Sequence, residues 1–189
     1  ENYTLNRNYT YFNVVKANIT ADVVALNVTV KDNTVFIIDN VTQGFNGKVN
    51  ITVEGNTYND IVKAYIEMGK LQAGNYTAKV TFYGNDNYNN LTLDVKFTVS
   101  RIDPDISVRI NDTTYPDKAV CEINVTDMAN GTVKVIVDGK VFEGTVKNGN
   151  ALVNLTGLSG GAKEAEIRFT STDKYNNDMN ATAKFTVNK

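Results

Sequence analysis

The feature that most constrains this chain is an internal repeat. Its second half repeats the order of its first half, with small drifts in offset that fall between elements rather than inside them. Such self-similarity over most of a chain predicts two homologous folding units rather than one irregular domain. The matching segments are NVTQGFNGKVNITVEGNTY (40–58) with NVTDMANGTVKVIVDGKVF (124–142), LQAGNYTAKVTFYGNDNYNN (71–90) with LSGGAKEAEIRFTSTDKYNN (158–177), and KFTVS (96–100) with KFTVN (184–188).

Composition and spacing predict that each repeat is all-β. The chain is rich in Val and Thr, which favour strands, and holds 27 Asn, which favours turns, with only 2 Pro. Alternation is clear in segments such as 133–137, where Val alternates with Lys and Ile. About seven short strands in fewer than 90 residues are typical of an immunoglobulin-like β-sandwich. In the first repeat we expect them at 26–31, 35–42, 47–53, 56–62, 64–68, 75–83 and 91–99.

One segment favours a helix locally. In residues 60–71, Ile61, Ala64, Tyr65 and Met68 lie at helical spacing. The matching segment of the second repeat contains an Asn-Gly hairpin turn between alternating strands. Because homologous repeats share strand order, we predict strand and turn here.

The alignment also predicts the domain organisation. Residues 17–100 form the first repeat and residues 101–189 the second. Residues 1–16 match a closing strand, with Phe12 on Phe97, and are expected to be the last strand of a preceding repeat in a longer array; the alternative is an extra first strand of the first domain. The short joint at 100–105, stiffened by Pro104, predicts a rod.

The segments 74–100 and 137–161 resemble the bacterial-type Ig-like repeats of adhesin-like surface proteins from methanogenic archaea. The shared sequence motifs are a V-D-G-K turn, an N-G turn and L-x-x-G before the penultimate strand. The resemblance spans both repeats and implies tandem Ig-like sandwiches displayed on a cell surface. One departure is that Tyr76, placed like the tyrosine corner of such sandwiches, is matched by Lys163, so the second repeat must hold that corner differently.

Composition argues against catalysis. With no His and one Cys, the chain lacks the residues of a Ser-His-Asp triad, a His metal site or an intrachain disulfide, and its net charge of −2 gives no basic field for nucleic acid. No Asp/Glu pair suited to glycoside hydrolysis recurs in both repeats. We therefore predict no enzyme activity, no catalytic, cofactor-binding or metal site, and no cofactor.

Three other features of the sequence are candidate sites. The oxygen-rich loops 84–90 and 171–178 could bind calcium, although Asn and Asp are ordinary turn residues; Tyr88 and Tyr175, which the alignment pairs along with Asp86 and Asp173, are expected to pack a sandwich end or the joint. Cys121, aligned with Ile37, is expected to be a small buried residue. Lys96 and Lys184 recur at matched positions and could form a Lys–Asn isopeptide crosslink if buried.

Thirteen Asn-x-Thr sequons exceed the number expected from composition alone, although strand-favouring N-V-T alternation supplies some of the excess. Each is a possible N-glycosylation site in an exported protein. They are Asn2, Asn8, Asn18, Asn27, Asn40, Asn50, Asn75, Asn90, Asn111, Asn124, Asn130, Asn154 and Asn180.

These observations predict a non-enzymatic stalk or adhesion module of an extracellular, cell-surface protein. Its expected partners are neighbouring Ig-like repeats and a host or partner-cell protein or glycan, with no nucleic acid and no membrane segment in this sequence. Alternatives are a carbohydrate- or protein-binding Ig-like module, although sugar platforms usually expose Trp and the chain has none, and a strand-exchanging filament subunit.

Overall fold

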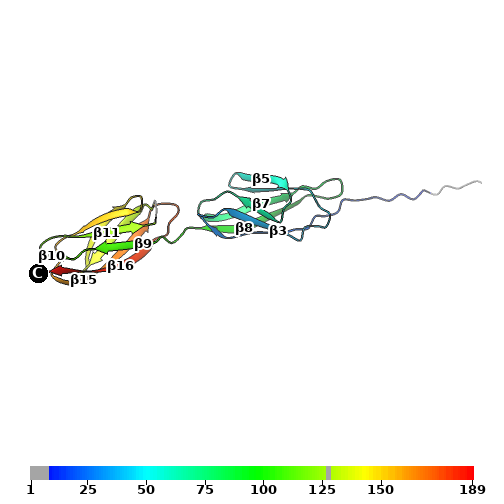
Figure 1. The fold of residues 1–189 in the computed structure, drawn as a ribbon. Helices are drawn as coiled ribbons and strands as arrows, with labels where there is room; N and C mark the ends of the chain where they lie inside the picture. The colour runs from blue at the N-terminus through cyan, green and yellow to red at the C-terminus, as the bar shows by residue number, and fades with distance from the viewer. Residues whose placement is uncertain (1–8, 127–128) are drawn as a thin grey trace, which may run out of the picture. The chain divides into compact units, whose positions relative to one another are not determined.

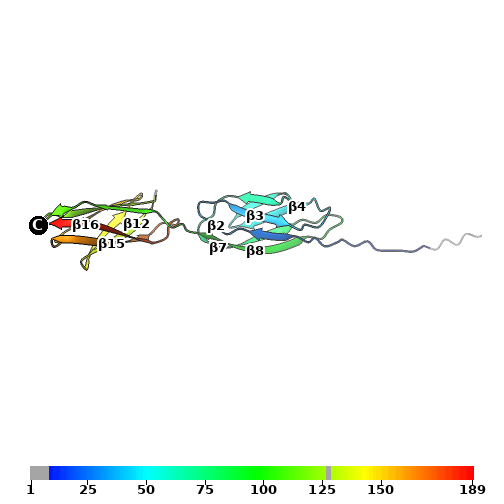
Figure 2. The same cartoon turned by 60° about the horizontal axis from the view of Figure 1, so that its bottom comes forward.

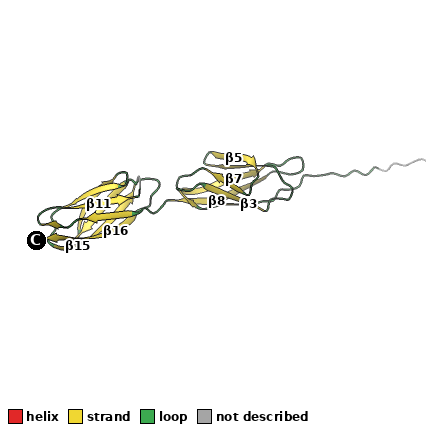
Figure 3. Cartoon of the chain, viewed as in Figure 1, coloured by secondary structure: helices red, strands yellow, loops and turns green. Residues whose placement is uncertain are grey.

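A computed structural model describes residues 9–126 and 129–189 of the chain, and that part is all-β. Its strands form two pairs of sheets, the first from residues between 22 and 100 and the second from residues between 106 and 188 (Figures 1 and 3). The described residues contain no helix. The all-β prediction is therefore confirmed, whereas the domain boundaries at 17–100 and 101–189 remain a prediction.

The first pair consists of a three-stranded sheet, in the order β1-β3-β6, and a five-stranded sheet, in the order β2-β8-β7-β4-β5. The strands are β1 Asp22–Ala25, β2 Val28–Thr29, β3 Thr34–Asp39, β4 Lys48–Val53, β5 Asn56–Ile61, β6 Tyr65–Met68, β7 Gly74–Phe82 and β8 Leu91–Ser100.

The second pair has the same order, with a three-stranded sheet β14-β11-β9 and a five-stranded sheet β10-β16-β15-β12-β13. Strands β12, β15 and β16 of the larger sheet are labelled in Figure 2. The strands are β9 Ile106–Ile110, β10 Thr113–Thr114, β11 Ala119–Val125, β12 Gly131–Val137, β13 Lys140–Val146, β14 Asn150–Leu155, β15 Gly161–Ser171 and β16 Met179–Asn188. In each pair the last strand lies between a short parallel strand and a long antiparallel one. Both are Ig-like β-sandwiches, as expected.

Each sandwich has its own apolar core between its two sheets. In the first, the ring of Phe97 packs edge-on against Phe36 at 5.8 Å and stacks on Tyr76 at 5.5 Å. In the second, Phe169 and Phe185 are 1% and 4% exposed. Phe82, Phe97, Phe169 and Phe185 recur at matched strand positions of the sequence, which predicts that they anchor the two cores, and all four are buried.

The matched glycines Gly47 and Gly131 are explained by this packing. A Cβ on Gly131 would lie 2.2 Å from the Thr170 carbonyl oxygen and 2.6 Å from the ring of Phe169, and one on Gly47 would meet the ring of Phe45 at a similarly short distance. Both positions therefore exclude a side chain because an aromatic ring and a backbone carbonyl oxygen, that of Tyr83 at Gly47 and that of Thr170 at Gly131, occupy the space.

Tight hairpins set the register of the antiparallel strands. Glu54-Gly55 and Asp138-Gly139 each have positive φ at both central residues, as do Asn148 and Gly149. Two consecutive positive φ values are the signature of a type I′ turn, whose twist matches that of the strands it joins. The Asn-Gly turn predicted from sequence is confirmed.

The segment 60–71 contains the end of β5 and all of β6 and no helix, so that prediction is confirmed. The first expected strand was wrong. Residues 26–31 were read as one strand, but the chain leaves the three-stranded sheet after Ala25 and joins the five-stranded sheet at Val28. Residues 23–26 are all apolar and show no alternation, so the sequence pattern did not mark β1.

Cys121 lies at the centre of the second three-stranded sheet, between β9 and β14. The residue in that place in the first sandwich is Phe36, which is also fully buried, and not Ile37, whose side chain points to the opposite face. The predicted pairing with Ile37 was therefore wrong by one residue. An additional residue after β3, Asn40 with φ of 50°, causes the shift.

Residues 9–16 are extended and exposed and pair with no strand of the described chain. The first backbone contact is made by Ala17, which forms a parallel bridge with Tyr88. For residues 9–16, the prediction that they lie outside the core of the first sandwich is confirmed; residues 1–8 lie outside the described part of the chain. Their assignment to a preceding repeat remains a prediction.

Candidate functional surfaces and sites

Most sequons lie on the surface. Of the eleven in the described residues, nine have exposed Asn side chains, while Asn50 and Asn130 are half-buried. Asn2 and Asn8 lie outside the described residues. The exposed nine are Asn18, Asn27, Asn40, Asn75, Asn90, Asn111, Asn124, Asn154 and Asn180.

Several of these side chains use their carbonyl oxygen to fix the backbone. Oδ1 of Asn27 accepts from the N–H of Thr98 at 2.8 Å, and Oδ1 of Asn90 accepts from the N–H of Gly84 at 2.7 Å. A glycan is attached to the side-chain nitrogen, Nδ2. The hydrogen bonds of Asn27 and Asn90 are made by Oδ1, so they do not engage the nitrogen that would be glycosylated. In Asn40, by contrast, Nδ2 itself donates to Asp22 at 2.7 Å.

The two loops considered for calcium use their oxygens in the same way. Oδ1 of Asn85 accepts from the N–H groups of Asn87 and Tyr88 at 2.8 and 3.1 Å. Oδ1 of Asp173 accepts from the N–H groups of Tyr175 and Asn176, both at 2.8 Å. These are Asx turns, which occupy the oxygens with backbone amides. In the residues that the structure describes, no group of three or more His, Cys, Asp or Glu side chains is placed to hold a metal ion.

The same bonds correct the loop alignment. They place Asn85 on Asp173 and Tyr88 on Asn176, whereas the sequence paired Asp86 with Asp173 and Tyr88 with Tyr175. The second loop has one more residue before its Asx turn, so matching by identity was wrong by one position.

The two tyrosines consequently differ in their surroundings. Tyr88 packs edge-on against Phe45, with ring centroids 5.7 Å apart, and so closes one end of the first sandwich as expected. Tyr175 is 57% exposed and does not fill that role.

Asp173 is held as an anion by its hydrogen bonds. Burial by itself would raise the pKa of Asp173, but the N–H groups of Asn130, Asn176 and Tyr175 and the side-chain amide of Asn176 together lower the pKa to about 2. The Asn130 N–H donates to Oδ2 at 3.0 Å. The carboxylate therefore ties the loop before β12 to the loop after β15.

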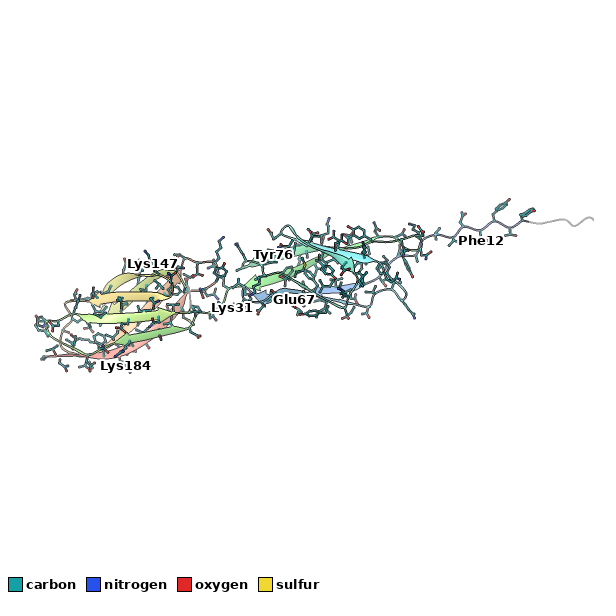
Figure 4. The ribbon with its side chains drawn as sticks, turned by 45° about the horizontal axis from the view of Figure 1, so that its top comes forward. Phe12, Lys31, Glu67, Tyr76, Lys147 and Lys184 are labelled. Carbon is teal, nitrogen blue, oxygen red and sulfur yellow. The ribbon has the colours of Figure 1, made fainter. Side chains whose placement is uncertain are left out.

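The isopeptide hypothesis is wrong for the residues proposed. Lys96 and Lys184 are exposed, because the matched strand positions point to solvent. Lys184 is labelled in Figure 4. The buried lysine is Lys163, whose side chain is 7% exposed and whose Nζ lies 2.6 Å from Oδ2 of Asp138. It also donates to Oγ of Ser159 at 2.9 Å.

Lys163 thus explains the missing tyrosine corner of the second sandwich. In the first, Tyr76, labelled in Figure 4, stacks on the ring of Phe97. In the second, an ion pair with the β12–β13 turn replaces that stacking, as the sequence required.

Cys121 is fully buried, and burial raises the pKa of its thiol to about 11. A thiol with so high a pKa forms little thiolate at neutral pH and is a poor nucleophile. The prediction of a small buried residue is confirmed.

The outer faces of the two three-stranded sheets differ in chemistry. In the first, the cross-strand row Val24, Ile37 and Tyr65 is apolar, with Val24 55% and Tyr65 56% exposed. The adjoining positions on this face include Asp22 and Asp39 on one side and Glu67 on the other. We call this set of six residues the β1-β3-β6 face.

The corresponding row of the second sandwich is Arg109, Glu122 and Leu152, so two of its three positions are charged. Two exposed sequons, Asn124 and Asn154, lie on the same face. An apolar row on one sandwich and a largely charged row on the other, whose face also bears two sequons, therefore occupy equivalent places.

These sheets and cores define Ig-like β-sandwiches with filled interiors. No protein-family model matches the chain, and no curated protein matches it. In the residues described, no helix has the length and apolarity required to cross a bilayer.

Several solved structures are similar to the chain at low identity. They include fibronectin(III)-like modules of Clostridium thermocellum CbhA (14% identity, 89% of this chain and 94% of that chain, TM-score 0.38), titin domains z1z2 in complex with telethonin (12%, 92% and 98%, 0.44), and the Yersinia pseudotuberculosis adhesin InvE (15%, 90% and 60%, 0.36). The sandwich assignment rests on the sheet topology above and not on these likenesses.

Proposed function

We propose that this chain is a non-enzymatic spacer module of an extracellular, adhesin-like cell-surface protein, which holds a binding region away from the surface. The observation that carries the proposal is the way the chain enters each sandwich. The N–H of Ala17 donates to the carbonyl of Asn87 at 2.8 Å, and the N–H of Asn89 donates back to Ala17 at 2.8 Å.

We call this reciprocal pair of backbone hydrogen bonds, made by the residue at which the chain enters a sandwich, the entry staple. An entry staple is also present where the chain enters the second sandwich. The N–H of Ile102 donates to the carbonyl of Tyr175 at 2.9 Å, and the N–H of Asn177 donates to Ile102 at 2.8 Å. Strand β8 ends at Ser100, so only Arg101 separates it from this stapled residue. So short a free segment supports a stiff joint, which is what a spacer needs.

Surface display is supported by the nine exposed sequons, which would carry glycans in an exported protein. Expression in a glycosylating host tests this point. We expect glycopeptides at exposed positions such as Asn124 and Asn154, with lower occupancy at the half-buried Asn50 and Asn130. Occupancy confined to the half-buried pair would contradict it.

Spin labels on cysteines introduced at the exposed Thr77 and Glu164 test the spacer itself. A stiff joint predicts a narrow distance distribution, unchanged when Arg101 is replaced by Lys. Insertion of a Gly-Ser-Gly-Ser segment after Arg101 is the flexible control and should broaden the distribution. A wild-type distribution as broad as that of the insertion variant would rule out the spacer.

The β1-β3-β6 face supports a second candidate, a carbohydrate-binding module. Its exposed Tyr65 ring beside Val24 offers a surface for the apolar face of a sugar. The carboxylates of Asp22 and Glu67 already accept from Asn40 and from the Tyr65 hydroxyl, and their remaining lone pairs would accept from sugar hydroxyls. Titration of neutral and acidic oligosaccharides against wild-type chain and Tyr65→Ala tests it, with Tyr175→Ala as a matched exposed-tyrosine control. Equal binding by all three chains, or binding by none, would rule it out.

A further inference from the structure

The segment 9–16 carries an apolar pattern that nothing in the described chain covers. Phe12 is 82% exposed and Val14 is 86% exposed, on a segment that pairs with no strand (Figure 4). Two large apolar side chains on alternate residues of an extended segment have the pattern of a strand that faces a core.

The entry staple supplies a register for this segment. Phe12 and Val14 precede the stapled Ala17 by five and three residues, and Phe97 and Val99 precede the stapled Ile102 by the same spacings. In β8 the latter two side chains are 4% and 2% exposed.

Strand β16 repeats the pattern, with Phe185 and Val187 4% and 2% exposed in the second core. Tyr11, which is 92% exposed, would occupy the outward position of Lys184 in this register. The segment therefore matches both closing strands at the two inward positions, Phe12 and Val14, while Val15 would lie at the outward position of Ser100 and Asn188.

The first sandwich cannot accommodate the segment as its own closing strand. That place, between β2 and β7, is already filled by β8. The corresponding place in the second sandwich is filled by β16, between β10 and β15.

We propose that residues 9–16 are a closing strand that completes an Ig-like sandwich lacking its own last strand. The partner is a repeat of the same type, whose vacant groove takes Phe12 and Val14 into its core and pairs the segment antiparallel with its penultimate strand. The partner would supply an aromatic-sized pocket like those that hold Phe97 and Phe185. This inference does not depend on the spacer role.

A full-length chimera tests the proposal inside a sandwich whose structure is known. Residues 182–188 (TAKFTVN) are replaced by the sequence of residues 9–15 (YTYFNVV), which keeps Phe at 185 and Val at 187. Hydrogen exchange in β15, the neighbour of β16, then reports whether the closing strand is paired. We expect protection of β15 within about tenfold of wild type.

A matched control inserts the sequence of residues 10–16 (TYFNVVK) at the same place. This one-residue slip turns the phenylalanine outward while keeping nearly the same composition. We expect it to lose β15 protection by roughly a hundredfold or more, as should the chimera carrying Phe185→Asp. Loss of protection in the in-register chimera, or equal protection in both registers, would overturn the proposal.

Discussion

The loop ends of the two sandwiches share one backbone scheme but are filled by different side chains. Asn85 and Asp173 each accept from two backbone N–H groups of their own loop. Beneath the first loop, Phe45 packs against Tyr88. The equivalent of Phe45 in the second sandwich is Ala129, since each donates its N–H to the carbonyl of a matched threonine at 3.0 Å.

The place of the aromatic pair is taken in the second sandwich by a polar network. Asp173 accepts from the Asn130 N–H and from the side chain of Asn176, which is only 4% exposed. The two loops therefore share the Asx hydrogen bonds that set their backbone conformation. The side chains packed beneath the loops differ, since they are aromatic in the first sandwich and polar or charged in the second. The two sandwiches should therefore respond differently to truncation and to acid.

The largest losses of stability should come from truncating core side chains. Because each sandwich has its own core, each truncation should destabilise only one of the two sandwiches. Phe82→Ala and Phe169→Ala should each reduce the free energy of unfolding by about 3–5 kcal/mol, because each leaves a cavity where a fully buried ring stood. Hydrogen exchange should show the loss only in the sandwich that carries the change. A loss shared equally by both would mean that they unfold as one unit.

Truncating Phe45, which packs beneath the loop of the first sandwich, should lower the stability of that sandwich alone. Phe45→Ala should cost about 2–3 kcal/mol, because the ring contacts both Phe82 and Tyr88. Chemical denaturation followed by tyrosine fluorescence measures it. The exposed Tyr175→Ala is the control and should change stability by less than about 0.5 kcal/mol; an equal cost for the two would contradict the closing role of Phe45.

The stability of the second sandwich should depend on the charges of Lys163 and Asp138, whereas the equivalent corner of the first is built on the uncharged ring of Tyr76, which stacks on Phe97. Asp138→Asn keeps a residue suited to positive φ but leaves the buried Lys163 without its carboxylate, at a cost of about 2 kcal/mol. The matched change Glu54→Gln at the equivalent turn of the first sandwich should cost less than about 0.5 kcal/mol. Equal denaturation midpoints for the two variants would show that the ion pair does not hold the corner.

Acid should destabilise the second sandwich more than the first. The pKa of Asp173 in the folded chain is about 2, below its ordinary value of 3.8, so its stabilisation is complete above about pH 4 and is lost as pH falls toward 2. The loss should be about 1 kcal/mol, since the group is partly exposed. Denaturation of wild type and Asp173→Asn from pH 5 to pH 2 measures it, and parallel curves for the two would contradict the assignment.

The repeat allowed most strands of the first sandwich to be predicted, because local patterns that were ambiguous in one half were clear in the other. The segment 60–71 is the best case, since the Asn148-Gly149 turn overruled its helical spacing. Strand β1 was missed because residues 23–26 are all apolar and show no alternation. The exposure of Lys96 and Lys184 follows from strand alternation and could have been foreseen.

Other features depend on contacts that sequence patterns do not encode. The pairing of Lys163 with Asp138 joins residues 25 positions apart, and only the folded sheets bring them together. The alignment of the two loops was wrong because it matched identical residues, Tyr88 with Tyr175. The structurally equivalent residues are Asn85 and Asp173, which accept the same hydrogen bonds although they are different amino acids. The sequence holds no signal for this register, because Asn85 and Asp86 are both followed by residues with backbone N–H groups and only the folded loop shows which one accepts from them.

The short parallel strands β2 and β10 have a mechanical consequence. In each sandwich the last strand runs alongside a strand near its beginning, Val28 beside Val99 and Thr113 beside Val187. Tension on the two ends of such a sandwich slides these strands along each other, so their hydrogen bonds bear load together rather than opening one after another. Resistance to pulling is then governed by the rate of unfolding under force rather than by equilibrium stability. A sandwich of modest thermal stability can thus remain folded under transient pulling.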